Sequence, residues 1–99
     1  DLLTSSPRPT AIFCGDDIVA TKVLQTAQKL DLKVPEELAI VGYGNLPITT
    51  RLYPELTTVD VPRYELGCQA MTLFAKSKMT EINDAHITLP AKLVIRQTT

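Results

Sequence analysis

Residues 10–30 constrain the fold of this chain more than any other stretch. They read TAIFCGDDIVATKVLQTAQKL, so a short apolar run is followed by Gly15, two aspartates and apolar residues at helical spacing. A continuous apolar run is typical of a strand that is covered on both faces, as in a parallel sheet. Either aspartate can accept hydrogen bonds at the N-terminus of a helix. The stretch therefore predicts a strand, an acidic turn and a helix.

The rest of the chain continues this alternation of strand and helix patterns. Leu38 to Val41 form a second continuous apolar run, and residues 56–61 are rich in β-branched side chains. Pro62 suits the first turn of a helix. This order predicts an α/β fold with a Rossmann-like, mostly parallel sheet. In chain order we expect strands at 10–14, 38–41, 56–61, 86–89 and 92–97, and helices at 17–30 and 62–78.

The first predicted helix has one apolar side. The positions at helical spacing are Val19, Val23, Ala27 and Leu30, with Ala20 and Leu24 beside them. This spacing predicts the stripe that covers the sheet. A proline at position 35 disfavours helix at the residue before it, so we expect the helix to end close to Leu30.

Composition and charge exclude several classes of protein. The chain has 99 residues, of which 44% are hydrophobic and 21% charged, as is typical of one globular domain. The net charge is −1 and the basic residues are scattered, so we expect no nucleic-acid-binding surface on this chain. No apolar run is long enough for a membrane span. Cys14 and Cys68 lie in separate apolar stretches, and we expect both to be buried free thiols in a reducing compartment.

The sequence contains no recognisable catalytic or metal-binding motif. His86 is the only histidine, and the G-x-S-x-G motif of a nucleophile elbow is absent. One histidine and two distant cysteines do not make a metal site. The pair Gly42 and Gly44 lacks the third glycine of a dinucleotide-binding loop, and there is no P-loop lysine. We therefore expect no enzyme activity, no cofactor and no metal.

Four segments, taken together and in this order, resemble the LacI/GalR family of bacterial transcriptional regulators. They are TAIFCGDD from residue 10, VPEELAIVGY from residue 34, PELTTV from residue 54 and PRYELG from residue 62. The resemblance covers about residues 9–97 and corresponds to the C-terminal part of the family's effector-binding core. It implies a partial periplasmic-binding-protein-like domain. The family's DNA-reading helix-turn-helix is expected to lie outside this sequence.

In that family, two Rossmann-like subdomains enclose a small effector, and the chain crosses between them three times. The resemblance assigns residues of about 1–55 and 91–99 to the C-terminal subdomain and about 56–90 to the N-terminal one. Part of such a fold leaves strand edges and helix faces uncovered. We therefore expect either a longer protein or self-association, including a domain-swapped dimer.

The resemblance also implies which residues contact the effector. Asp16 matches a polar residue that binds effector hydroxyls, and a carboxylate can accept two such hydrogen bonds. Asp17 is then interpreted as the helix cap. Arg63 brings a fixed positive charge, which suggests a sugar acid or sugar phosphate as the effector. Gly44 stands where many members carry an aspartate, and Asn45 is the adjacent candidate. The expected effector-contacting residues are Asp16, Gly44, Asn45, Val61 and Arg63.

The family forms dimers through the C-terminal subdomain. The matching positions here are the outer side of the first helix around Thr21 and the segment from Ile48 to Leu52. Apolar side chains in an irregular segment bracketed by prolines are explained if a second subunit covers them. The expected interface residues are Thr21, Ile48, Thr50 and Leu52.

The function implied is that of a cytoplasmic, homodimeric regulator that senses a sugar, sugar acid or nucleoside. Effector binding would alter the dimer and so the affinity of the full protein for operator DNA. No membrane association is expected. The alternative is part of a periplasmic sugar-binding protein of a transporter, which shares the fold. A Rossmann-type enzyme fragment is a third interpretation, disfavoured because no phosphate loop or catalytic motif is present.

Overall fold

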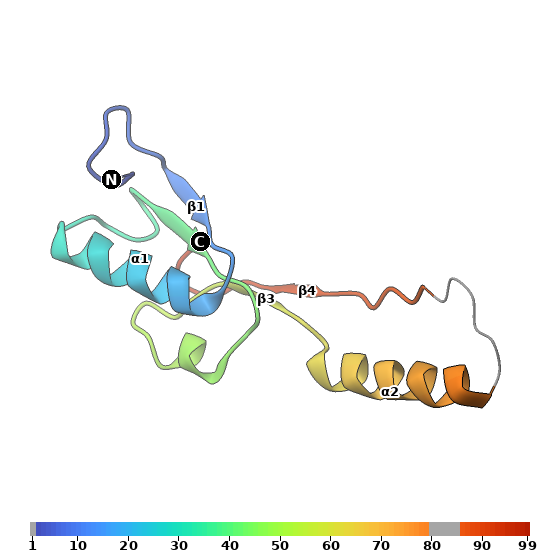
Figure 1. Ribbon diagram of the computed structural model, residues 1–99. Helices are drawn as coiled ribbons and strands as arrows, with labels where there is room; N and C mark the ends of the chain where they lie inside the picture. The colour runs from blue at the N-terminus through green and yellow to red at the C-terminus, as the bar shows by residue number, and fades with distance from the viewer. Residues whose placement is uncertain (1, 80–85) are drawn as a thin grey trace. The chain divides into compact units, whose positions relative to one another are not determined.

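The computed structural model describes residues 2–79 and 86–99, and the chain divides into two compact units. The first unit comprises the residues up to Asp60 together with Lys92–Thr99, and the second comprises Val61–Ala91. The predicted assignment of these parts to the two subdomains of the family core stays a prediction. In chain order the elements are β1 (Ala11–Phe13), α1 (Asp17–Lys29), β2 (Ala39–Val41), the 3-10 helix η1 (Pro47–Thr50), β3 (Thr58–Asp60), α2 (Arg63–Met79) and β4 (Lys92–Val94) (Figure 1).

The strands of the first unit form a short ladder. β1 and β2 are parallel, with Ile12 opposite Ile40. Beyond β2 the ladder continues toward β3, because the backbone N–H groups of Gly42 and Gly44 donate to the carbonyls of Thr57 and Val59, at 2.9 and 2.8 Å. These contacts confirm the predicted parallel arrangement of the first three strands.

The last strand departs from the expected parallel pattern. β4 pairs with β3 in the antiparallel sense, with Leu93 opposite Val59. Residues 86–89 form no strand, so that prediction is wrong. Pro90 follows them and cannot donate a ladder hydrogen bond. Alternation of apolar and polar residues over four positions was too short a signal to identify a strand there.

Helix α1 has a defined beginning and end. Asp16 is its N-cap: the carboxylate accepts a hydrogen bond from the backbone nitrogen of Val19 at 2.7 Å. The helix ends because Asp31 adopts a left-handed conformation, with φ of 55°. The N–H of Leu32 then donates to the carbonyl of Ala27 at 3.0 Å. This end lies where the sequence predicted it.

The buried side of α1 is rotated relative to the predicted stripe. Ala20, Leu24 and Ala27 are buried, together with Asp17 and Thr21. Val19, by contrast, is 48% exposed. The buried side is polar at its start, and this is possible because the Thr21 hydroxyl donates to the Asp17 carbonyl at 2.8 Å. Counting only apolar positions missed these two polar residues and so misplaced the face.

One apolar core lies in the first unit, where α1 packs beside β2 (Figure 1). Because 0% of the Leu38, Ile40 and Leu56 side chains is exposed, these residues form its centre. The C-terminal segment closes the core, since the Thr98 hydroxyl donates to the carbonyl of Ile40 at 2.7 Å. The same hydroxyl accepts from the Thr57 backbone nitrogen at 2.9 Å. The buried apolar residues are Leu3, Cys14, Ala20, Leu24, Ala27, Leu38, Ile40 and Leu56.

The second unit is built on α2, which is exposed along its length. No side chain from Arg63 to Lys78 is buried, and Phe74 is 54% exposed. Leu66, Leu73 and Phe74 are spaced as one helical face. An apolar helical face in water is typical of a helix that packs against a further part of its protein or a partner. None of the helices that the structure describes has the length and apolar character needed to cross a bilayer.

Candidate functional site

The candidate site lies where the first three strands end. The turn after β1 and the turn after β2 contact each other directly, because the N–H of Asp17 donates to the carbonyl of Tyr43 at 3.1 Å. The carboxyl ends of parallel strands are the usual position of ligand sites in α/β sheets. Of the predicted effector-contacting residues, Asp16, Gly44 and Asn45 come from these two turns.

Asp16 is exposed and its two carboxylate oxygens differ. Oδ1 accepts the capping hydrogen bond from Val19. Within the described part of the chain, Oδ2 accepts no hydrogen bond. The predicted division of roles, with Asp17 as the cap, is therefore wrong: Asp16 caps the helix. The capping hydrogen bond occupies only one carboxylate oxygen. A ligand hydroxyl could therefore donate a hydrogen bond to the other oxygen of Asp16.

Asp17 is a fully buried carboxylate that connects three elements. Its Oδ1 accepts from the hydroxyl of Thr58 at 2.6 Å, and its Oδ2 accepts from the backbone nitrogen of Leu46 at 2.7 Å. The Thr58 oxygen in turn accepts from the backbone nitrogen of Asn45 at 3.2 Å. A buried charge requires such partners, because without them its desolvation costs several kcal/mol. Asp17 therefore fixes the start of α1 against β3 and the loop that follows β2.

Gly42 makes this arrangement possible. A Cβ at position 42 would collide with Oδ1 of Asp17, and it would also lie 3.1 Å from a methyl carbon of Leu56. Glycine at this position therefore has a steric reason, because a buried carboxylate fills the space beside the backbone.

The turn at Gly44 and Asn45 has an unusual backbone conformation. The φ angles are 121° at Gly44 and 53° at Asn45. Only glycine adopts such angles freely, and asparagine tolerates the left-handed region better than most other residues. The side-chain oxygen Oδ1 of Asn45 accepts from Nη2 of Arg96 at 2.9 Å. Asn45 is half-buried, and its side-chain oxygen already accepts a hydrogen bond from within the protein.

Arg96 was not identified from the sequence, yet it is the most connected side chain near the site. Its Nη1 donates to the hydroxyl oxygen of Thr49 at 3.0 Å and to the carbonyl of Leu56 at 2.9 Å. Its own backbone nitrogen donates to the Thr57 hydroxyl at 2.9 Å. The sequence showed only an arginine within a weak strand pattern near the C-terminus. Nothing in that pattern indicated contacts to the loop after β2.

Val61 and Arg63, the other predicted effector-contacting residues, belong to the second unit. Val61 is half-buried and Arg63 is exposed at the first turn of α2. The N–H of Arg63 donates to the carbonyl of Val61 at 2.7 Å, so the two residues form a tight connection into the helix. Their predicted contact with an effector stays a prediction.

The predicted interface residues differ in exposure. Thr21 is only 6% exposed, so the expectation that it lies on the outer side of the helix is wrong. Ile48 and Leu52 are half-buried and Thr50 is exposed. Tyr53, which follows this segment, is 86% exposed, and its carbonyl accepts from the side chain of Gln28 at 2.9 Å. Contact of this segment with a second subunit stays a prediction.

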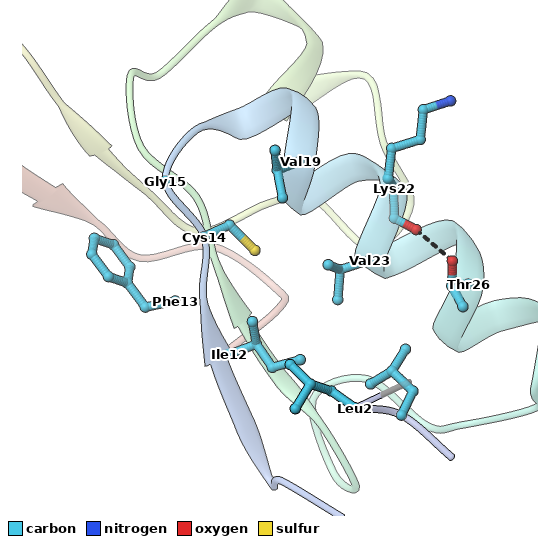
Figure 2. Close-up of a pocket in the computed structure, with 10 residues that line it drawn as sticks. Leu2, Ile12, Phe13, Cys14, Gly15, Val19, Lys22, Val23 and Thr26 are labelled. Atoms are coloured by element: carbon cyan, nitrogen blue, oxygen red, sulfur yellow. Dashed lines mark hydrogen bonds between the residues drawn. The ribbon is translucent and has the colours of Figure 1, made fainter. Parts of the chain in front are cut away.

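A cavity of about 430 Å³ opens between β1 and α1, and its lining is mostly apolar. Figure 2 shows the side chains of Ile12 and Val23 pointing into it, whereas Phe13 and the amine of Lys22 point away. Asp16 and Asn45 do not line this cavity. It therefore differs from the predicted effector site and is an uncovered part of the apolar face beside the sheet.

Cys14 lines the same cavity and is a buried free thiol, as predicted. The free thiol of Cys68 is exposed, so its predicted burial is wrong. Burial raises the pKa of Cys14, and the negative charge of Asp16 raises it further. A raised pKa makes the thiol a poor nucleophile at neutral pH. Among the described residues, no group of histidine, cysteine and acidic side chains could hold a metal ion.

The fold defines a periplasmic-binding-protein-like class of α/β protein. Residues 1–99 match the model of the periplasmic binding protein-like domain, and the chain belongs to that family. Within it, the relatives are LacI/GalR-type regulators, as the sequence motifs indicated. The chain is 43% identical over 94 residues to the NTD biosynthesis operon regulator NtdR of Bacillus subtilis. That match covers 93% of this chain and 29% of NtdR, so the chain spans less than a third of that relative's length.

Solved structures agree with this placement. Regulator CcpA of Lactococcus lactis is 32% identical, with a TM-score of 0.87 over 95% of this chain and 35% of that chain. A LacI family transcriptional regulator of Lactobacillus casei, solved with bound sucrose, is also 32% identical. Its TM-score is 0.78 over 93% of this chain and 34% of the regulator.

Proposed function

We propose that this chain is the effector-binding and dimerisation region of a LacI-type bacterial transcriptional regulator that works in the cytoplasm. Its effector is a small molecule with several hydroxyl groups, a sugar or sugar acid, with nucleosides as the next class. The region performs no chemistry. The relatives are named as regulators, which favours this function over the sugar-binding protein of a transporter.

The observation that carries the proposal is the position of Asp16. It lies at the carboxyl end of β1, is exposed, and uses only Oδ1 for the helix cap. A carboxylate oxygen at a strand end is well suited to accept from sugar hydroxyls. The sucrose-bound relative from Lactobacillus casei supports a sugar as the class of effector.

The remaining residues complete the proposed site. Gly44 leaves space where a side chain would otherwise reach the ligand, and Asn45 shapes the adjacent turn. Val61 contributes an apolar contact and Arg63 a positive charge. Effector binding would change the dimer, for which Ile48, Thr50 and Leu52 supply the surface, and so the affinity for operator DNA.

A ligand screen with a matched pair of variants tests the proposal. The thermal unfolding midpoint of the protein is measured with sucrose, ribose, gluconate and glucose 6-phosphate, because a ligand that binds only the native state raises it. Asp16→Ser keeps a capping oxygen but removes the carboxylate. We expect this variant to lose the ligand-induced shift while its midpoint without ligand changes little. Glu36→Ser removes a distant exposed carboxylate and should keep the shift. An unchanged shift in Asp16→Ser would overturn the assigned role.

A further inference from the structure

We infer that Arg96 is a positioning residue for the proposed effector site: its guanidinium holds the Gly44–Asn45 turn in place through Oδ1 of Asn45. The main task of Asn45 is then to accept from Arg96 and not to bind the effector. The part of this inference that concerns ligand binding rests on the proposed function. The contacts themselves are tested below without any ligand.

The turn needs external support because of its conformation. Two successive residues have positive φ, and the second, Asn45, carries a side chain. A non-glycine residue in the left-handed region persists when surrounding contacts favour it. The Asn45 side chain supplies such a contact, since its Oδ1 lies 2.9 Å from Nη2 of Arg96.

The turn is held from two sides by opposite charges. On one side Asp17, at the start of α1, accepts from the backbone nitrogen of Leu46 at 2.7 Å. On the other, Arg96, after β4, donates to the side chain of Asn45. The two charged groups therefore bind consecutive residues of the same turn. They come from segments that lie far apart in the sequence, so the position of the turn depends on both.

The shape of the guanidinium explains why an arginine is present. Nη2 reaches Asn45, while Nη1 reaches both the Thr49 hydroxyl and the Leu56 carbonyl. Three acceptors in fixed directions match the planar fork of arginine, whereas a lysine amine is a single point charge on a flexible stem. The Thr49 hydroxyl is correctly oriented as an acceptor, because it donates its own hydrogen to the carbonyl of Leu46 at 2.7 Å.

Amide hydrogen exchange of the protein, without ligand, tests the contact. In Arg96→Met the amides of Leu46 and Thr49 should exchange about tenfold to a hundredfold faster, as expected when a charged hydrogen-bond donor is lost. Amides in the middle of α1 should be unaffected. In Arg96→Lys the exchange rates of the Leu46 and Thr49 amides should lie between those of the parent protein and Arg96→Met, because lysine keeps the charge but lacks the planar fork of arginine. Arg51→Met removes an exposed arginine near the same loop and should leave these amides unchanged.

A double-mutant cycle then separates positioning from direct binding. Asn45→Ala removes only the contact with Nη2, whereas Arg96→Met also removes the contacts with Thr49 and Leu56, so Asn45→Ala should accelerate exchange at Leu46 less than Arg96→Met does. The double variant should exchange little faster than Arg96→Met, because Arg96→Met already removes the contact with Asn45. Asn45→Asp retains the acceptor and should preserve protection. Additive effects, or unchanged exchange in Arg96→Met, would overturn the inference.

Sucrose, ribose and gluconate then serve as probes of the role in binding. We expect some probes to raise the unfolding midpoint of the parent protein. For such a probe, Arg96→Met should need about a tenfold higher concentration to reach the same rise. Asn45→Asp should retain the effect. If Asn45→Asp loses binding while its exchange stays protected, the side chain binds the effector directly and the inference is wrong. If no probe binds the parent protein, the proposed function fails for these sugars, and the exchange result still decides the contact.

Discussion

The carboxylate of Asp17 lies in the space where Gly42 has no Cβ. The two residues come from the first turn of α1 and the end of β2, and 0% of Asp17 is exposed. Because the glycine leaves room, the carboxylate reaches the Thr58 hydroxyl and the Leu46 backbone nitrogen together. This close approach determines how the strand-end turns of the candidate site are assembled.

Substitution of Gly42 by alanine should destabilise the protein by about 2–3 kcal/mol, because overpacking would displace the Asp17 carboxylate from its partners. Unfolding in urea, followed by circular dichroism, gives this value. Gly67→Ala is the control. A Cβ at position 67 meets nothing within 4 Å, and alanine is the better helix former in α2. The control should be neutral or stabilise by up to about 1 kcal/mol. Equal effects of both changes would contradict the steric argument.

Removal of the Asp17 side chain should cost about 3 kcal/mol. Asp17→Ala leaves the Leu46 N–H and the Thr58 hydroxyl without their acceptor, and each unsatisfied group costs about 1–3 kcal/mol. Thr58→Val removes one of these contacts and also leaves the Asn45 N–H without its acceptor, so it should cost about 2–3 kcal/mol. The double variant should be less destabilised than the sum, because the two residues share a hydrogen bond. Strict additivity in urea unfolding would show that the contact contributes nothing.

The N-cap of α1 provides a smaller and separable effect. Asp16→Ala should reduce the free energy of unfolding by about 1 kcal/mol, since the Val19 N–H loses its acceptor. Asp16→Ser should cost less because serine is also a good cap. Equal stability of the alanine and serine variants would show that the cap contributes nothing measurable. Both variants lack the carboxylate proposed to bind the ligand, but only the alanine variant also lacks a cap. The pair therefore separates the effect of Asp16 on stability from its effect on ligand binding.

Local features of this fold were largely predictable from the sequence, whereas contacts between distant segments were not. The apolar run at β1 and the aspartates before α1 identified the strand end and the helix start, because these depend on neighbouring residues. The helix cap was assigned to Asp17 instead of Asp16, since both are good caps and only the position of Thr58 distinguishes them. Arg96 was missed because its partners lie far away in the sequence.

The two thiols should differ in reactivity. Burial and the charge of Asp16 raise the pKa of Cys14, so at about pH 8 less of it is thiolate than for an ordinary thiol. Iodoacetamide should therefore modify the exposed Cys68 at least about tenfold faster, as measured by peptide mass spectrometry. Because the pKa of Cys14 is higher in the folded state, its thiol contributes fully to stability at neutral pH. That contribution is lost as the pH rises through the folded pKa. Similar rates for both cysteines would contradict the burial of Cys14.

The charge of Arg63 should separate anionic from neutral ligands. If Arg63 reaches the proposed effector, Arg63→Gln should weaken binding of gluconate or glucose 6-phosphate by about tenfold to a hundredfold, because a charge-assisted hydrogen bond is lost. Binding of sucrose, which has no charge, should change little. Titration calorimetry at two salt concentrations measures both affinities, and salt should weaken the anionic ligands only. Arg51→Gln removes an equal charge from the first unit and is the matched control. Equal losses for charged and neutral ligands would show that Arg63 supports the fold of the helix start and does not select the ligand.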